Sequence, residues 1–174
     1  MPQRFVVGID LGTTNSALGW VDTSAGDAAR VRIQEIPQLV NPGEVAPRTL
    51  LPSFLYAPGE LDFPRGSVSL PWDEQPPFVA GELARRRGAE NPARLIASAK
   101  SWLSHGAANR TSPILPWGAP EEIPHISPVD ASAEYLKHLA AVFDREVANG
   151  GPALALARQD VLLTGPGSFD EEAR

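Results

Sequence analysis

The sequence contains no cysteine, no long hydrophobic run and no excess of basic residues, and each absence excludes a class of protein. Without cysteine, neither disulfides nor thiolate metal sites can form. Apolar runs such as Phe5-Val6-Val7 and Val161-Leu162-Leu163 are strand-sized and far too short to span a bilayer. The net charge of −6 argues against a nucleic-acid partner, because phosphate binding needs a basic surface. Residues 1–4 lead into a strand-like segment without an apolar signal region, so we expect a cytoplasmic protein with no membrane partner.

What the sequence does contain is typical of a globular chain. Its 174 residues suffice for one medium domain or two small lobes with a buried core. Hydrophobic residues make up 43% and charged residues 21%, close to the averages for soluble domains, which excludes extensive disorder.

Hydrophobic patterning predicts strands at the beginning of the chain. Residues 5–11 and 16–22 flank a turn-like Gly12-Thr13-Thr14-Asn15, and Val31, Ile33 and Ile36 indicate a third strand. Short connections between three strands predict an antiparallel meander. Prolines then interrupt residues 37–77 and leave room only for short strands such as 53–56.

Helices are predicted in the second half. We expect helices at 81–88, at 91–103 after an Asn91-Pro92 start, and at 127–149. The last begins with a capping-box spacing between Ser127 and Asp130, and apolar residues recur through it at helical intervals: Val129, Ala133, Leu136, Ala140, Phe143 and Val147. A strand at 160–164 and a further helix start at 168–171 follow. The chain ends inside that helix, so we expect a truncated domain.

The basic cluster is expected to be largely solvated, and the histidines do not indicate a site. At least two of Arg85, Arg86 and Arg87 are expected on a solvated helix face. His105, His125 and His138 have no ligand-like spacing, and a surface position is expected for each.

One turn in the sequence is suited to phosphate chemistry: Gly8-Ile9-Asp10-Leu11-Gly12-Thr13-Thr14-Asn15-Ser16. A carboxylate ends a buried strand, and a glycine turn with two hydroxyl residues follows. Because Gly12 has no Cβ, backbone amides and hydroxyls can approach phosphate oxygens, and Asp10 can hold Mg²⁺ through its waters. An ordinary hairpin turn, with Asp10 capping backbone amides, is the alternative explanation.

Rival motifs fail at named residues. An aspartic-protease loop needs Thr or Ser at Leu11, and a haloacid-dehalogenase phosphatase needs a second Asp at Gly12. The glycine-rich Walker loop with its Lys-Ser/Thr occurs nowhere in the chain.

The turn resembles, almost letter for letter, the first phosphate loop of the seventy-kilodalton heat-shock chaperone (DnaK-like) family. Three later segments resemble that family in the same order. Asn41-Pro42-Gly43-Glu44 with Arg48-Thr49-Leu50-Leu51-Pro52-Ser53 resembles "IPN-x-G-x-R-x-T-P-S", with Leu51 in place of threonine. Val79-Ala80-Gly81-Glu82-Leu83-Ala84-Arg85, Asn91-Pro92 and Ser98-Ala99-Lys100 resemble "VG-x-x-AK…NP…SIK". The segment from Val161 to Phe169, with Ala173-Arg174, resembles "AVITVPAYF…AQR".

The resemblance implies an α/β fold of the ribonuclease-H-like, actin and heat-shock ATPase type, with an inserted smaller α+β lobe. Residues 1–38 and 112–174 would form the base lobe and residues 39–111 the upper lobe, with a Pro-rich excursion at about 57–78. The implied ligands are ATP or ADP and Mg²⁺. Unfolded client polypeptides and co-chaperones would bind through other parts of the protein, and the surface exposed by truncation favours dimers.

The resemblance also implies roles for individual residues. Asp10 would contact magnesium waters, while Gly12, Thr13 and Thr14 would contact the nucleotide phosphates. Pro166 and Arg174 match residues of the relay to the peptide-binding domain; a turn proline and a solvated arginine are the alternatives. We assign the family's catalytic lysine to Arg85, although Arg86 and Arg87 are one and two residues away.

Three functions remain open from the sequence. The first is a chaperone-type ATPase in which water attacks the γ-phosphate in line and magnesium neutralises charge. The second is a nucleotide-binding pseudo-ATPase, because arginine keeps the charge of lysine but not its geometry. The third is a carbohydrate kinase of the same superfamily. These 174 residues alone are expected to be inactive.

Overall fold

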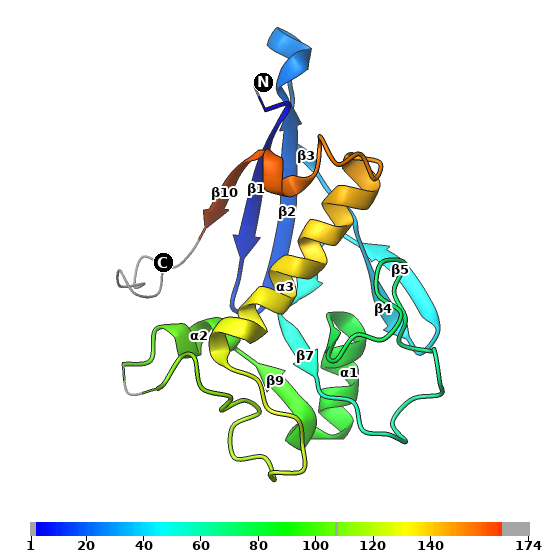
Figure 1. Ribbon diagram of the computed structural model, residues 1–174, viewed down its shortest axis with the longest axis vertical. Coiled ribbons are helices and arrows are strands. Elements are labelled where there is room, and N and C mark those ends of the chain that lie inside the picture. Colours follow the sequence, from blue (N-terminus) through cyan, green and yellow to red (C-terminus); the bar gives the residue numbers. More distant parts are fainter. Residues whose placement is uncertain (1–2, 107, 165–174) are drawn as a thin grey trace.

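The computed structural model describes residues 3–106 and 108–164, which form a mixed α/β structure with three β-sheets (Figure 1). The main sheet has the strand order β10-β1-β2-β3, and β6 also pairs with β2. Strands β1 and β2 and strands β2 and β3 pair antiparallel, whereas β10 pairs parallel with β1. The strands of this sheet are β1 (Phe5–Leu11), β2 (Asn15–Asp22), β3 (Arg32–Ile33), β6 (Leu51–Pro52) and β10 (Asp160–Thr164).

Strand β1 shows why this sheet forms and which way Asp10 faces. Its alternate residues are buried in one core: Phe5, Val7, Ile9 and Leu11. Successive side chains of a strand point to opposite faces, so Asp10 and Gly8 lie on the face away from that core, where both are exposed. The predicted strands at 5–11, 16–22 and 160–164 are confirmed.

The predicted third strand is only partly correct. Arg32–Ile33 pairs with β2 as β3, but Ile36 begins β4 (Ile36–Asn41), which forms a separate hairpin with β5 (Glu44–Arg48). Burial explains the division, because Val31 and Ile33 are exposed while Ile36 is fully buried.

The third sheet has the order β8-β7-β9 and is covered by helix α1. Its elements are β7 (Phe54–Tyr56), β8 (Val79–Ala80), α1 (Glu82–Glu90) and β9 (Leu95–Ala97). Between β7 and β8, the Pro-rich segment packs Phe63, Val68 and Leu70 on a small core around Tyr56. Arg85 and Arg86 are exposed and Arg87 is half-buried, which confirms the predicted solvated face.

The helix predicted at 91–103 is wrong. A short 3₁₀ turn (Pro92–Arg94) leads into β9, and only α2 (Ala99–Leu103) is helical. Tertiary pairing overrides the local signal here, because β9 pairs with β7 and buries Ile96. Ser98, at φ 55°, makes the corner between β9 and α2.

Helix α3 (Pro128–Val142) crosses one face of the main sheet (Figure 1), and a π-helical turn (Phe143–Val147) continues it. Ser127 caps it as predicted, since its Oγ accepts the Asp130 N–H at 3.0 Å. The side chains buried deepest are those of Ala131, Ser132, Tyr135, His138, Leu139 and Val142. The apolar residues that recur at helical intervals in the sequence are not all buried in the first turns of α3. Val129 is exposed, and Ala133 and Leu136 are half-buried.

The expected surface position is wrong for His138. His105 is exposed and His125 is half-buried, but His138 is only 5% exposed. Its Nε2 lies 2.9 Å from the Pro37 carbonyl, and its ring contacts Trp72 edge to face at 5.0 Å. The Pro-rich segment covers this face of α3. The spacing of apolar residues along the helix does not by itself reveal that this face is covered.

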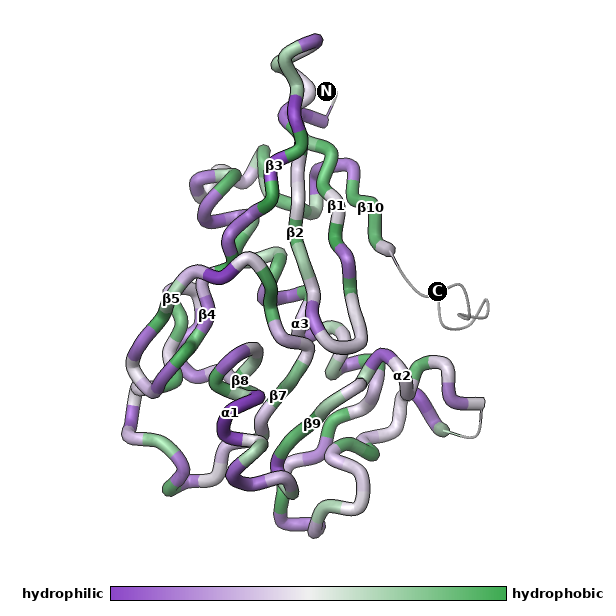
Figure 2. The backbone as a smooth tube through the Cα atoms, turned by 180° about the vertical axis from the view of Figure 1, so that it is seen from behind, coloured by the Kyte–Doolittle hydropathy of each residue, from purple (hydrophilic) through white to green (hydrophobic). Residues whose placement is uncertain are grey.

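Hydrophobic residues concentrate in the central strands and along β10 at the sheet edge (Figure 2). Residues 3–106 and 108–164 contain no helix with both the length and the hydrophobicity that a membrane crossing requires.

Candidate phosphate-binding turn

The β1–β2 connection, residues 12–14, is a tight turn that only glycine can begin. A Cβ on Gly12 would lie 2.0 Å from the Asn15 carbonyl oxygen, well inside contact distance. Thr13 and Thr14 are exposed at the tip of the turn. The turn therefore presents polar groups outward from the end of a buried strand.

Asp10 ends β1 on the exposed face of the sheet, beside the neighbouring strand β10. Its register partner is Thr164, whose Oγ1 donates to Asp10 Oδ1 at 2.7 Å. This hydrogen bond fixes the orientation of the carboxylate. Asp10 is thus a surface carboxylate held at the strand end next to the turn.

Lys100 brings a positive charge to the same strand end. It lies in the first turn of α2, is only 8% exposed, and its Nζ donates to the Leu11 carbonyl oxygen. Burial lowers the pKa of Lys100, while the negative charge of Asp10 opposes that shift. The structure therefore joins Asp10, the glycine turn and a buried lysine from a segment 89 residues away in sequence.

Arg85 is not part of this cluster. It is exposed on α1, and within the described ranges its side chain forms no hydrogen bond, ion pair or ring contact. Arg86 binds the Val40 carbonyl and Asn41, and Arg87 binds Glu90. Of the residues predicted for the site, the structure brings together Asp10, Gly12, Thr13 and Thr14, and it places Lys100 rather than Arg85 beside them.

The sequence does carry a signal for Lys100, in the Ser98-Ala99-Lys100 segment of the family resemblance. The predicted continuous helix over 91–103 gives no reason to place this lysine beside the turn. Pro166 and Arg174, the predicted relay residues, lie outside the described residues, as does the helix start expected at 168–171.

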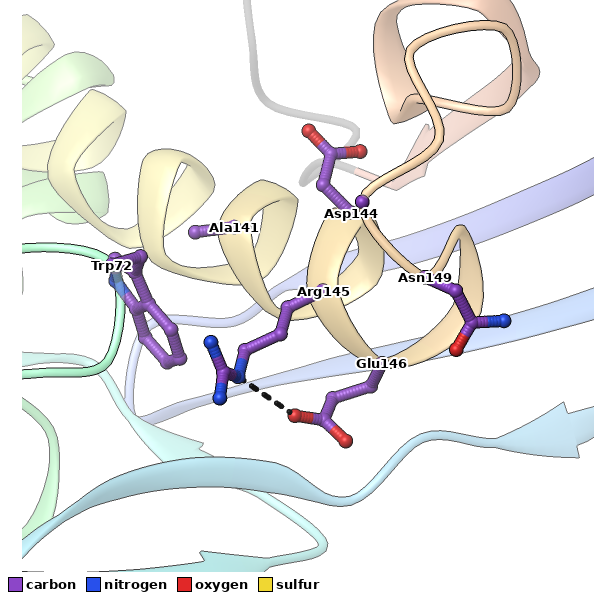
Figure 3. Close-up of a pocket in the computed structure, with 7 residues that line it drawn as sticks. Trp72, Ala141, Asp144, Arg145, Glu146 and Asn149 are labelled. Carbon is purple, nitrogen blue, oxygen red and sulfur yellow. Dashed lines mark ion pairs between the residues drawn. The ribbon is translucent and has the colours of Figure 1, made fainter.

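A cavity of about 740 Å³ lies elsewhere, between Trp72 and the C-terminal turns of α3. Figure 3 shows Trp72 on one side of it and Arg145 and Glu146 on the other, joined by an ion pair of 3.4 Å. Asp144 also lines it, but its Oδ1 already accepts the Leu156 N–H at 2.6 Å. None of the predicted site residues lines this cavity, so the turn remains the candidate site.

Comparison with known proteins gives a distant similarity. No family model matches the chain. A protein named "Chaperone protein HscA homolog", from Tolumonas auensis, is 27% identical over 183 residues, an alignment that covers 99% of this chain. The same alignment covers 24% of that protein, so the chain spans about a quarter of its length. The similarity supports at most a distant relationship to the seventy-kilodalton heat-shock chaperones.

Proposed function

We propose that this chain supplies the magnesium-and-phosphate side of the ATP site in a chaperone-like ATPase. The observation that carries the proposal is the meeting of Asp10, the Gly12–Thr14 turn and the buried Lys100 at the end of β1. The Lys100 ammonium, bonded to the Leu11 carbonyl, places a positive charge at the base of the turn, where a phosphate site would need one.

The groups present fit a nucleotide phosphate. A Cβ on Gly12 would meet the Asn15 carbonyl oxygen, so glycine lets the turn close tightly, and the backbone amides of a tight turn can bind an anion. Exposed Thr13 and Thr14 add hydroxyl donors. The Lys100 ammonium would contribute a compact positive charge next to the turn that binds the phosphates.

The groups also fit Mg²⁺ held through its waters. In the part of the chain that the structure describes, no three Asp, Glu or His side chains gather in a direct metal site. Asp10 alone suits magnesium, which keeps several waters and takes one or two carboxylates plus phosphate oxygens. When bound, the ion would neutralise charge on the phosphates. Asp10, oriented by Thr164, would hold its hydration shell in place.

Lys100 replaces Arg85 in this proposal as the cation that acts on the reacting phosphate. A lysine is a point charge with rotatable donors, suited to hold an attacking water or a γ-phosphate oxygen. The pseudo-ATPase hypothesis depended on an arginine at this place. With Lys100 at the turn, hydrolysis in the intact protein is the better-supported function.

We propose a ribonuclease-H-like fold for β1, β2, β3 and β10 with α3. The antiparallel meander β1-β2-β3 and the parallel return to β10 beside β1 support it. Residues 39–111, which include β7, β8, α1, β9 and α2, would be the inserted lobe. From the name of the similar protein, we propose that the intact protein is a chaperone. Unfolded polypeptides and co-chaperones are the partners that the family resemblance implies.

The test compares two cation variants in the intact protein. Lys100→Ala should lower kcat for ATP hydrolysis by about a hundredfold or more, because it removes a charge aimed at the reacting phosphate. Arg85→Ala is the matched control and should change kcat less than about threefold, a shift that corresponds to under 1 kcal/mol. The reverse ranking would restore Arg85 as the catalytic cation and contradict the proposal.

A further inference from the structure

A pair of buried serines lies beneath the proposed phosphate turn. Ser16 is 0% exposed and Ser53 is 2% exposed, and their hydroxyl oxygens are 3.0 Å apart. Ser53 Oγ lies 2.8 Å from the Gly12 carbonyl oxygen, and the Ser53 N–H donates to the Thr14 carbonyl at 2.8 Å. Ser53 therefore binds two backbone oxygens of the turn, 41 and 39 positions away in sequence.

The directions of these hydrogen bonds follow from counting protons. A carbonyl oxygen only accepts, so the single hydroxyl proton of Ser53 must go to Gly12. The Ser16 hydroxyl must then donate to Ser53 Oγ. The result is a one-way chain from Ser16 through Ser53 to the Gly12 carbonyl.

This arrangement sets the direction of an amide in the turn. In a planar trans peptide unit, the C=O and the following N–H point in opposite directions. Because the Gly12 carbonyl points inward to Ser53, the N–H group of Thr13 points the other way. Outward N–H groups at a turn are what an anion requires.

We propose that Ser53 is a positioning residue for the phosphate turn, which aims the Thr13 amide at the bound phosphate. The inference rests on the proposed function of the turn. Ser53 follows β6, which pairs with β2 at Asn15 and Ser16, and precedes β7 of the third sheet. Strand β9 of that same sheet leads to Lys100, so one sheet positions both the amide and the lysine.

The test is a pair of serine variants in the intact protein. Ser53→Ala removes the hydroxyl bound to Gly12, whereas Ser16→Ala removes an equally buried hydroxyl and leaves that bond in place. Both should lose similar thermal stability. Ser53→Ala should weaken Mg-ATP binding by about tenfold, and Ser16→Ala by less than about threefold, as expected for one oriented hydrogen bond to a charged group.

Ser53→Cys keeps the size of the side chain with a weaker donor and should lie between the wild type and Ser53→Ala. If the two alanine variants bind Mg-ATP equally well, or if Ser53→Cys matches the wild type, Ser53 serves only the core and the inference is wrong. If the wild-type protein itself neither binds nor hydrolyses Mg-ATP, the proposed function fails first, and the inference fails with it. Binding is measured by isothermal titration, with unfolding followed on the same samples.

Discussion

His138 is a buried imidazole in the middle of α3, and its protonation should couple folding to pH. Burial lowers its pKa to about 4 from 6.5, with the Pro37 carbonyl opposing the shift. Between these values the unfolded chain binds more protons than the folded one, so stability falls as the pH drops. The cavity beside His138 is also lined by three charged residues: Asp73, Glu134 and Lys137.

The expected loss of unfolding free energy across that window is about 3 kcal/mol. Because carboxylates also titrate near its lower end, the measurement is the difference between wild type and His138→Gln in urea unfolding at a series of pH values. Gln keeps an amide donor for Pro37 but does not titrate. Parallel pH profiles for the two proteins would show that His138 is not the titrating group.

Tyr135, one helical turn before Leu139, is fully buried, and burial raises the pKa of its phenol. Within residues 3–106 and 108–164, its hydroxyl has no hydrogen-bond partner. A buried donor without a partner costs about 1–3 kcal/mol. Tyr135→Phe should therefore raise the unfolding free energy by about 1 kcal/mol. Chemical denaturation measures it, and a decrease would mean that the hydroxyl is satisfied in solution.

The β1–β2 turn is the element whose shape the proposed function depends on. Gly12→Ala places a Cβ against the Asn15 carbonyl and should cost about 1–3 kcal/mol of stability, as overpacking does. It should also abolish Mg-ATP binding, because the turn must open to relieve the clash between the new Cβ and the Asn15 carbonyl oxygen. Gly106→Ala is the control, since a Cβ there meets nothing within 4 Å. Wild-type nucleotide binding by Gly12→Ala would show that the turn does not contact phosphate.

Elements with strong local patterns were predictable, and elements set by distant contacts were not. Strand β1 follows from the alternation of buried and exposed residues, and strand β10 follows from an apolar run. The Ser127 cap follows from the capping-box spacing in the sequence. Residues 91–103 have a helix start, yet pairing of β9 with β7 makes part of them a strand. The same holds at the site, where the turn is visible in the sequence but its buried lysine depends on the Ser98 corner.

At the scale of the whole molecule, β10 exposes an apolar run that we propose favours self-association. Val161, Leu162 and Leu163 are 42%, 64% and 54% exposed, and Leu163 borders an apolar groove with Leu136 and Ala140 of α3. Exposed apolar strands of this kind pair with other chains. Sedimentation velocity of this 174-residue chain should show dimers that Leu163→Glu removes. A wild-type chain that stays monomeric at high micromolar concentration would contradict the expectation.

The central claim is that the Gly12–Thr14 turn binds the phosphates of Mg-ATP. The described residues offer one turn, Asp10 and Lys100, and amide contacts in water give only about 1 kcal/mol each. Since association itself costs several kcal/mol, we expect this chain alone to bind at millimolar concentrations.

Backbone NMR of the 174-residue chain during a Mg-ATP titration is the most direct test. The amide signals of Gly12, Thr13 and Thr14 should shift together, with half-saturation in the millimolar range. The shifts should shrink without magnesium and in Lys100→Ala. If the turn amides do not move while the chain is folded, or if saturable shifts occur only elsewhere, the turn is an ordinary hairpin and the proposed site is wrong.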